Sequence, residues 1–173
     1  MSTSLAAKNE ISSAVAGETR AGKYLTFQLG QEEFGVRVLK VREIMGVQEI
    51  TRVPQTPPHV KGVINLRGKV VPVIDLRLKF GLPAADYTQR TCIIVTQIMG
   101  ESGLILMGAI VDGVCEVVNL AAADIEDTPD FGEETAGQYL LGMAKVKGKV
   151  KILLDIDKVL CTQDLDQLNA IVK

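Results

Sequence analysis

The sequence predicts a mainly β protein made of two similar small β-barrels, each with about five strands and short helical turns. Three observations predict this fold. Hydrophobic residues make up 47% of the chain and aromatic residues 4%, a composition suited to strands that pack through Val, Ile and Leu. Short apolar runs alternate with turns that contain glycine. One hairpin pattern occurs twice, and 173 residues are enough for two small units that share an interface.

The N-terminal part of the chain changes character near Tyr24. Residues 1–21 are rich in small and polar side chains, which is typical of a flexible arm. Residues 24–29 and 33–38 then form two β-rich runs separated by Gly30-Gln31. We therefore expect the first barrel to begin with a β-hairpin.

A short helical turn is expected after this hairpin. Val38, Val41, Ile44 and Met45 recur at helical spacing. A segment with three prolines follows at residues 54–58, and proline marks turns and loops. The segment is therefore expected to be a surface loop.

A second hairpin is predicted at residues 62–76. Residues 62–66 and 69–76 have the composition of strands, and Arg67-Gly68 joins them where glycine can take the positive φ of a tight turn. Asp75 is well placed to cap a short helix that ends at Gly81. Arg67 is therefore expected at a hairpin tip.

The same order of features returns in the second half of the chain. An offset of 80 residues aligns Gly62 with Gly142, Gly68 with Gly148, Lys69 with Lys149, Val70 with Val150 and Asp75 with Asp155. An offset of 73 residues aligns Gly35 with Gly108, Val41 with Val114 and Glu43 with Glu116. A long repeat present only twice favours duplication of a whole barrel over a repeat array. We place barrel one at about residues 23–83 and barrel two at about residues 88–157.

The last residues of the chain predict a C-terminal helix over residues 162–173. Leu165, Leu168 and Val172 would share one face of this helix, behind Thr162 or Asp164 as its cap. We expect that face to pack on a barrel.

Composition argues against several classes of protein. With 19 basic and 21 acidic residues the net charge is −2, which gives no overall field to attract nucleic acid or an anionic membrane. The three cysteines are far apart and lack metal-ligand spacing. No apolar run is long enough to cross a bilayer, and the N-terminus lacks a hydrophobic signal core. These observations predict a cytoplasmic protein with no direct membrane insertion, metal or cofactor.

No catalytic residue is predicted. The sole histidine, His59, lies in the proline-containing loop. Residues 99–103 partly resemble a nucleophile elbow, but Leu104 stands where the second glycine is required, so we interpret them as a hairpin turn. Cys92 and Cys115 lie in apolar runs and are expected to be buried, inert thiols.

Nucleic-acid binding is the main alternative from another functional class. Small barrels often bind oligonucleotides, and four lysines alternate along one predicted hairpin, namely Lys145, Lys147, Lys149 and Lys151. However, no aromatic residues lie between these lysines to stack on bases, and lysines also protect an exposed strand from edge-to-edge pairing. Edge protection is therefore the preferred interpretation.

Several sequence motifs carry a family resemblance. Glu-Phe-Gly-Val at residues 33–36 and Val-Arg-Glu-Ile at 41–44 come first. Lys-Gly-Val-Ile-Asn-Leu-Arg-Gly at 61–68 and Val-Pro-Val-Ile-Asp-Leu at 71–76 follow, and then Ile-Val-Asp-Gly-Val at 110–114. In content and order these motifs resemble the CheW family of chemotaxis coupling proteins. The resemblance extends from about Tyr24 to Leu160 and assigns residues 22–161 to a CheW-like domain.

The resemblance implies a pair of SH3-like barrels that act as a non-catalytic adaptor. Its partners would be the cytoplasmic tip of a chemoreceptor and the regulatory domain of the histidine kinase CheA, in arrays at the membrane. The implied receptor-binding residues are Val41, Glu43, Gly62, Asn65 and Arg67. Glu43 and Arg67 together would offer a charge pair beside an apolar groove.

The kinase face is expected to use exposed apolar residues of the second barrel. The candidates are Leu104, Met107 and Met143. Lys147 takes the place of Arg67 in the repeat, so the two hairpin tips differ. We therefore expect the two barrels to differ in function.

Overall fold

The first hairpin forms where the sequence predicts it. The computed structural model describes residues 20–100, 103–127 and 139–160. In this structure β1 (Gly22–Leu29) pairs antiparallel with β2 (Glu32–Arg37), and Gly30 takes a φ of 61° in the turn between them. The second predicted hairpin also forms, from β4 (Val60–Leu66) and β5 (Lys69–Asp75).

The remaining elements are mostly short strands. The strands are β3 (Val41–Gly46), β6 (Cys92–Gly100), β7 (Gly103–Val111), β8 (Gly113–Leu120), β9 (Ile125–Glu126), β10 (Leu140–Val146) and β11 (Lys149–Leu154). Two 3-10 turns are η1 (Val38–Lys40) and η2 (Ala122–Asp124), and two short helices are α2 (Leu76–Lys79) and α3 (Ile156–Val159). The mainly β fold with short helical turns is confirmed.

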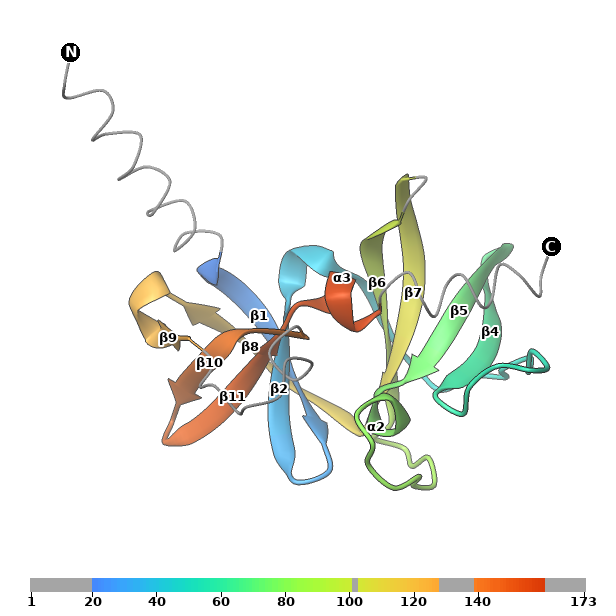
Figure 1. Cartoon of the computed structure of the whole chain (residues 1–173), viewed down its shortest axis with the longest axis horizontal. Coiled ribbons are helices and arrows are strands. Elements are labelled where there is room, and N and C mark those ends of the chain that lie inside the picture. The colour runs from blue at the N-terminus through green and yellow to red at the C-terminus, as the bar shows by residue number, and fades with distance from the viewer. Residues whose placement is uncertain (1–19, 101–102, 128–138, 161–173) are drawn as a thin grey trace, which may run out of the picture.

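The strands form two sheets, shown side by side in Figure 1. Sheet A has the order β8-β1-β2-β11-β10-β9, and sheet B has the order β3-β6-β7-β5-β4. Sheet A therefore has one strand more than the five expected, because the two-residue strand β9 pairs with β10. Parallel pairing of β11 with β2 and of β5 with β7 joins segments that are far apart in the sequence.

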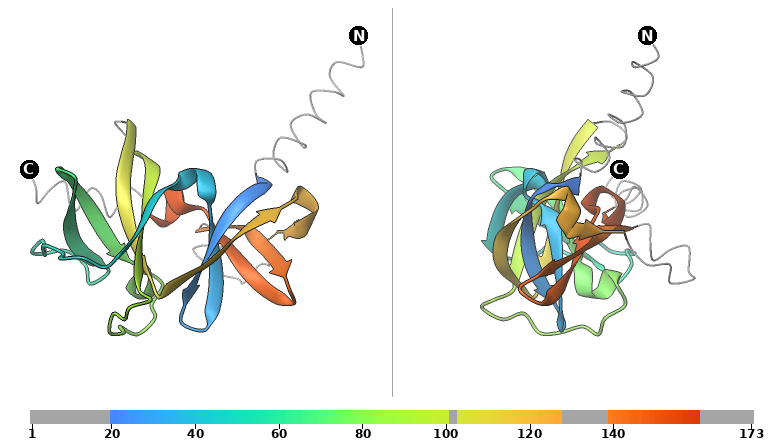
Figure 2. Two further views of the ribbon diagram at one scale, coloured as in Figure 1. Left: turned by 180° about the vertical axis from the view of Figure 1, so that it is seen from behind. Right: turned by 90° about the vertical axis from the view of Figure 1, so that its left-hand side faces the viewer.

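Sheet membership corrects the predicted barrel boundaries at about residues 23–83 and 88–157. Strands β1 and β2 of the first repeat join β8, β10 and β11 of the second repeat, whereas β6 and β7 of the second repeat join β3, β4 and β5 of the first. In the left-hand view of Figure 2 the blue strands β1 and β2 lie with the orange strands β10 and β11, apart from the green strands β4 and β5. The two repeats thus exchange their first two strands.

Two ion pairs connect the short helices to the segments in which the chain crosses from one sheet to the other. Arg77 of α2 pairs with Asp112 at the crossing from β7 to β8, at 2.6 Å. Asp157 of α3 pairs with Lys40 at the crossing from β2 to β3, at 2.8 Å. Arg77 and Asp157 align at the offset of 80 residues and carry opposite charges, and their partners lie at the two equivalent crossings. In both repeats the short helix is therefore bonded to a crossing.

The core has three parts that match this architecture. One cluster, which includes Ile64 and Ile93, lies within sheet B, and another, which includes Tyr24 and Leu153, lies within sheet A. The largest cluster combines residues of both sheets, among them Phe27 and Met107. Because apolar burial is the main stabilising term in folding, this shared cluster joins the two sheets into one body.

The repeated hairpins have closely matching backbones. Arg67 and Lys147 have φ values of 51° and 52°, and the glycines after them have values of 87° and 81°. A register shift also occurs at Gly62 and at Gly142. These shared irregularities support the repeat that the sequence predicts.

The helical turn predicted through Met45 is wrong beyond Lys40, because residues 41–46 form β3 and alternate between partly buried and exposed. Asp75 caps α2 as predicted, by accepting hydrogen bonds from Arg77 N and Leu78 N, whereas Asp155 makes no side-chain cap on α3. Most of the predicted arm, residues 1–19, and the predicted C-terminal helix, residues 162–173, lie outside the described residues.

Candidate functional site

The β4–β5 hairpin presents Arg67 at its tip. Arg67 is in the left-handed region with a φ of 51°, and the side-chain oxygen of Asn65 accepts a hydrogen bond from Gly68 N at 2.8 Å. Asparagine stabilises turns in this way because its short side chain can reach the backbone a few residues on. Asn65 therefore has a clear structural role in shaping the tip.

Arg67 forms a two-point ion pair with Glu43 of β3. The guanidinium nitrogens lie 2.6 and 3.3 Å from the two carboxylate oxygens, and the Arg67 side chain is 75% exposed. Hydrogen bonding to Glu43, followed by its negative charge, raises the pKa of Arg67. The pair thus holds a permanent positive charge at a defined place on the surface.

This ion pair joins the two edges of sheet B. Strands β3 and β4 are at opposite ends of the strand order, yet Thr51, in the chain after β3, pairs with Val63 of β4 through N–O distances of 2.8 and 2.9 Å. The Gln48 side chain also donates to Asn65 O at 3.4 Å. The sheet therefore curls until its edges meet, which brings Glu43 to Arg67.

A hollow of 390 Å³ lies beside the ion pair. Glu43 and Arg67 line one part of it, and Leu66, Leu104 and Leu106 supply apolar surface. The charge pair therefore lies beside a hollow of mixed character, because Arg42, Lys69 and Gln97 line it as well. Leu104, predicted for the kinase, lies on the same hollow as two residues predicted for the receptor.

Val41 and Gly62 differ from the other predicted receptor-binding residues. Val41 is partly buried and packs against the shared core. Gly62 is buried with a φ of 139°, and a Cβ placed there would lie 2.0 Å from Thr51 O. Gly62 is therefore required for the close approach of the loop to β4.

The predicted kinase-binding residues do not form one surface. Leu104 is 56% exposed, and its cross-strand partner Met99 is 63% exposed. Met107 has no exposed surface, so its prediction as a contact residue is wrong: its side chain packs in the shared core. Met143 is partly buried on sheet A, away from Leu104 in the strand order, and lines a largely apolar cleft of 770 Å³ with Phe34 and Phe80.

The exposed methionine and the apolar cleft were missed by sequence reasoning. Met99 belongs to the run that also supplies core residues, and its exposure follows from its place near the end of the β6–β7 hairpin. The cleft gathers residues of sheet A, such as Leu29, and residues at the end of α2, such as Phe80, that no sequence motif links. The one sequence signal for the exposure of Met99 was its position opposite Leu104 beside the predicted hairpin turn.

The second hairpin tip carries a weaker counterpart of the Arg67–Glu43 pair. Lys147 lies 3.4 Å from Glu116 of β8, and these residues align with Arg67 and Glu43 in the repeat. A lysine makes a single-point contact where arginine makes two. The predicted difference between the two tips is therefore reflected in their geometry.

Two of the four lysines in this hairpin already face carboxylates. Lys147 pairs with Glu116, and Lys151 is buried and pairs with Glu33 of β2. Burial lowers the pKa of Lys151. The row predicted as the alternative nucleic-acid site thus leaves Lys145 and Lys149 without an ion pair among the described residues.

The cysteine prediction is partly wrong. Cys115 is exposed on β8, where exposed positions alternate with partly buried ones, and Cys92 is partly buried at the start of β6. Within the described part of the chain, no three or more His, Cys, Asp or Glu side chains gather as a metal-binding group. The third cysteine, Cys161, lies outside the described residues.

Comparison with known proteins decides the family. The family model described as the CheW-like domain matches residues 23–163. The chain belongs to the CheW family. It is 40% identical over 161 residues to the chemotaxis protein CheW of Klebsiella aerogenes, covering 93% of this chain and 95% of that protein. It is also 34% identical to the CheW of Rhizobium meliloti, covering 84% and 97% of the two chains.

A solved CheW structure has the same fold. The scaffolding protein TtCheW from Thermoanaerobacter tengcongensis matches with a TM-score of 0.71 and 33% identity, over 78% of this chain and 89% of that one. The chain is therefore a member of a family of chemotaxis coupling and scaffold proteins. Among the residues described, no helix has the length and apolar character needed to span a bilayer.

Proposed function

We propose that this CheW-family protein is a non-catalytic adaptor that couples chemoreceptor cytoplasmic tips to the histidine kinase CheA in membrane-associated arrays. The observation that carries the proposal is the exposed Arg67–Glu43 pair beside the hollow that also contains Leu104. An exposed residue that is held in a strained left-handed turn and paired at two points is preorganised for contact.

The receptor would bind at the side of the hollow formed by β3 and the β4–β5 tip. Glu43 and Arg67 supply fixed charges there, and Asn65 holds the turn. Fixed charges of both signs select the orientation of a partner more than they raise its affinity. Val41 and Gly62 would act indirectly, Val41 through its packing on the shared core and Gly62 through the close approach of Thr51 to β4.

The kinase would bind at the β6–β7 tip. Leu104 and Met99 form an exposed apolar pair there, and exposed apolar side chains gathered at one place are typical of protein contacts. We retain Leu104 as a proposed kinase contact at this tip and add Met99, while Met107 is excluded by its burial. Met143 stays a proposed contact of its own on sheet A, apart from this tip. Modest interfaces of this kind become a stable array through repetition.

The receptor contact is tested by comparing two hairpin tips within one protein. Arg67→Ala should weaken binding to a purified receptor cytoplasmic tip by at least about tenfold, the size of effect expected for a central charged contact. Lys147→Ala removes the corresponding pair from sheet A and is the matched control. Circular dichroism should show that both variants remain folded, because each replaces an exposed tip residue.

The kinase contact is tested separately. Leu104→Ala should weaken binding to the CheA regulatory domain and leave receptor binding unchanged, whereas Val117→Ala, at a similarly exposed valine of β8, should change neither. Loss of both partners in Leu104→Ala would mean that one shared surface replaces the two proposed. If wild-type protein binds neither partner but binds single-stranded oligonucleotide through Lys145 and Lys149, the adaptor proposal is wrong.

A further inference from the structure

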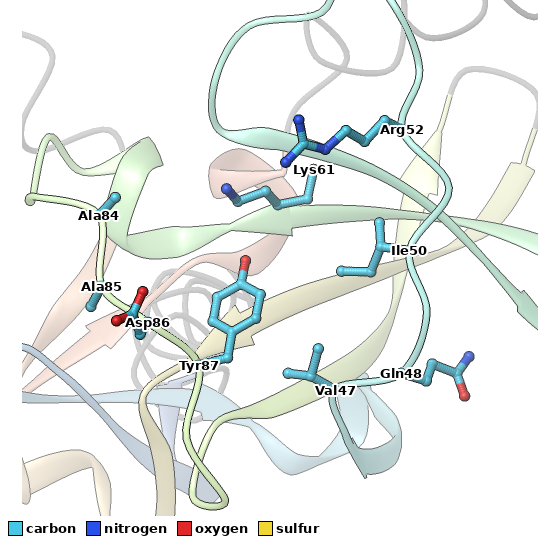
Figure 3. A pocket seen from close by; sticks show the side chains of 9 residues that line it. All are labelled: Val47, Gln48, Ile50, Arg52, Lys61, Ala84, Ala85, Asp86 and Tyr87. Atoms are coloured by element: carbon cyan, nitrogen blue, oxygen red, sulfur yellow. The ribbon is translucent and has the colours of Figure 1, made fainter.

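A cavity of 530 Å³ lies on sheet B between the loop after β3 and the segment before β6. Its walls come from residues 47–52, from Lys61 of β4 and from residues 84–87 (Figure 3). The pairing of Thr51 with Val63 fixes the loop against β4, so that Arg52 and Lys61 line the same wall. The cavity is within the size range of small-molecule sites.

Polar groups of this cavity extend toward a common space. Figure 3 shows the side chains of Arg52, Lys61 and Tyr87 directed into it. Within residues 20–100, 103–127 and 139–160, neither the Arg52 side chain nor the Lys61 side chain has an ion-pair or hydrogen-bond partner. Asp86 also lines the cavity and bonds to neither. The Tyr87 hydroxyl donates to Asp75 at 3.2 Å. The cavity therefore offers two cations and no carboxylate bonded to them.

An apolar wall faces these charges. Val47 and Ile50 are partly buried and pack against the cluster of apolar residues inside sheet B. A ligand that carries both an anionic group and an apolar group would match the two walls. Its apolar part would be removed from water while its charge meets the cations.

The position of sheet A that corresponds to Arg52 carries a charge that is paired within the chain. β9 pairs Glu126 with Met143 as Thr51 pairs with Val63, so Asp127 corresponds to Arg52 and Leu141 to Lys61. Asp127 is bonded to Arg20 at 2.7 Å, and Arg20 also donates to Leu141 O at 3.4 Å. Sheet A thus pairs its charge within the chain, whereas sheet B has the opposite charge at that position.

We propose that the sheet B cavity binds the carboxylate or phosphate group of an organic anion whose apolar part packs on Val47 and Ile50. Arg52 would supply the two-point contact that guanidinium groups make with such anions, and Lys61 a second charge. The site is separate from the Arg67–Glu43 hollow, since the lining residues of the two differ. The proposal goes beyond the adaptor function and needs neither partner for its test.

The test is a ¹⁵N NMR titration of the full chain with defined probes. Phenyl phosphate and phenylacetate carry the anion on an apolar group, the peptide N-acetyl-Glu-Leu-amide presents an acidic side chain, inorganic phosphate lacks the apolar group, and benzyl alcohol lacks the charge. We expect saturable shifts at the amides of residues 47–52, 61 and 84–87, strongest for one of the first three probes. The probe with the highest affinity shows whether the site prefers a phosphate, a small carboxylate or an acidic side chain of a peptide.

Two variants and a control make the result decisive. Arg52→Gln and Lys61→Gln should each weaken the best probe at least tenfold, whereas Lys23→Gln, at an exposed lysine of β1, should leave its affinity unchanged. Arg52 is exposed, so its replacement is expected to preserve the fold, and the dispersion of the spectrum checks this. The proposal is overturned if no anionic probe gives saturable shifts at these amides, or if both glutamine variants bind as well as the wild type.

Discussion

The two repeats have closely matching hairpin backbones and different side chains at corresponding positions, both exposed and buried. At the hairpin tips, Arg67 binds Glu43 at two points, and Lys147 reaches Glu116 at one. Beside the parallel strand pair, sheet A buries Lys151 against Glu33 where the repeat places Val71 and Leu106 in sheet B. The two repeats thus share their turns and register shifts, while their side-chain contacts differ, including the Asp75 cap that Asp155 does not repeat.

The largest expected change in the free energy of unfolding comes from breaking the buried ion pair between Lys151 and Glu33, which has no counterpart in sheet B. Lys151→Met should lower the free energy of unfolding by about 3 kcal/mol, because it leaves the Glu33 carboxylate without its counter-charge in a partly buried place. Chemical denaturation measures the change.

The double substitution Glu33→Leu with Lys151→Val copies the apolar pair of sheet B and provides the control. We expect its stability to equal or exceed that of the wild type, since replacing both members of a buried ion pair by apolar residues is often neutral or stabilising. A double variant less stable than Lys151→Met would show that the two sheets do not tolerate the same packing at this place.

The next largest change in stability is expected where a neighbouring segment lies close to a glycine of a strand, at Gly62 in sheet B and at Gly142 in sheet A. Gly62→Ala should cost about 2–3 kcal/mol, because the new Cβ would overlap Thr51 O and the φ of 139° disfavours a side chain. Gly142→Ala should cost somewhat less, since the new Cβ would lie 2.7 Å from its nearest backbone atom, the carbonyl oxygen of Glu126. Thermal unfolding of both variants measures the difference. Gly46→Ala, where no atom lies within 4 Å, should change stability little, and an equal loss there would contradict the steric explanation.

A smaller effect is expected from the two helix caps. Asp75→Ala should cost about 1 kcal/mol, because it removes the side-chain acceptor for Arg77 N and Leu78 N. Asp155→Ala should cost much less, since Asp155 makes no such bond on α3. Denaturation curves of the two variants compare the caps directly, and equal losses would contradict this assignment.

The smallest effect should appear only at alkaline pH. Burial, aided by the Asp75 carboxylate, raises the pKa of Tyr87 above its ordinary value of 10.0. The unfolded chain therefore loses this proton before the folded chain does, and Tyr87 lowers the free energy of unfolding as pH rises above 10 toward the folded pKa. Tyr87→Phe should therefore reduce the loss of stability above pH 10. Near pH 7 the substitution should not change how stability depends on pH. A loss above pH 10 as steep as in the wild type would assign it to other groups.

Local chemistry made the hairpins and the Asp75 cap predictable. Glycine at the turns and aliphatic runs on both sides specify a hairpin within a few residues, and the offset of 80 residues correctly paired Arg67 with Lys147. The strand exchange was not predictable in this way. It depends on the parallel pairing of Lys151 with Glu33 and of Val73 with Gly108, which lie far apart in the chain.

The candidate site was predictable in part for the same reason. Arg67 was expected at a tip, and its contact with Glu43 follows once the edges of sheet B meet. The burial of Met107 was missed because strand alternation tells which residues share a face but not which face is covered. The cavity at Arg52 and Lys61 also depends on tertiary structure, since two loops and a strand form it.

The exchange of β1–β2 for β6–β7 makes this single chain the equivalent of a domain-swapped dimer whose two subunits have been fused. Neither repeat contains a complete sheet, so each repeat completes its sheet with strands of the other, as the subunits of a swapped dimer do. Because both halves belong to one chain, this partnership is internal. The surface of one half can therefore differ from that of the other, which identical subunits of a symmetric dimer do not allow.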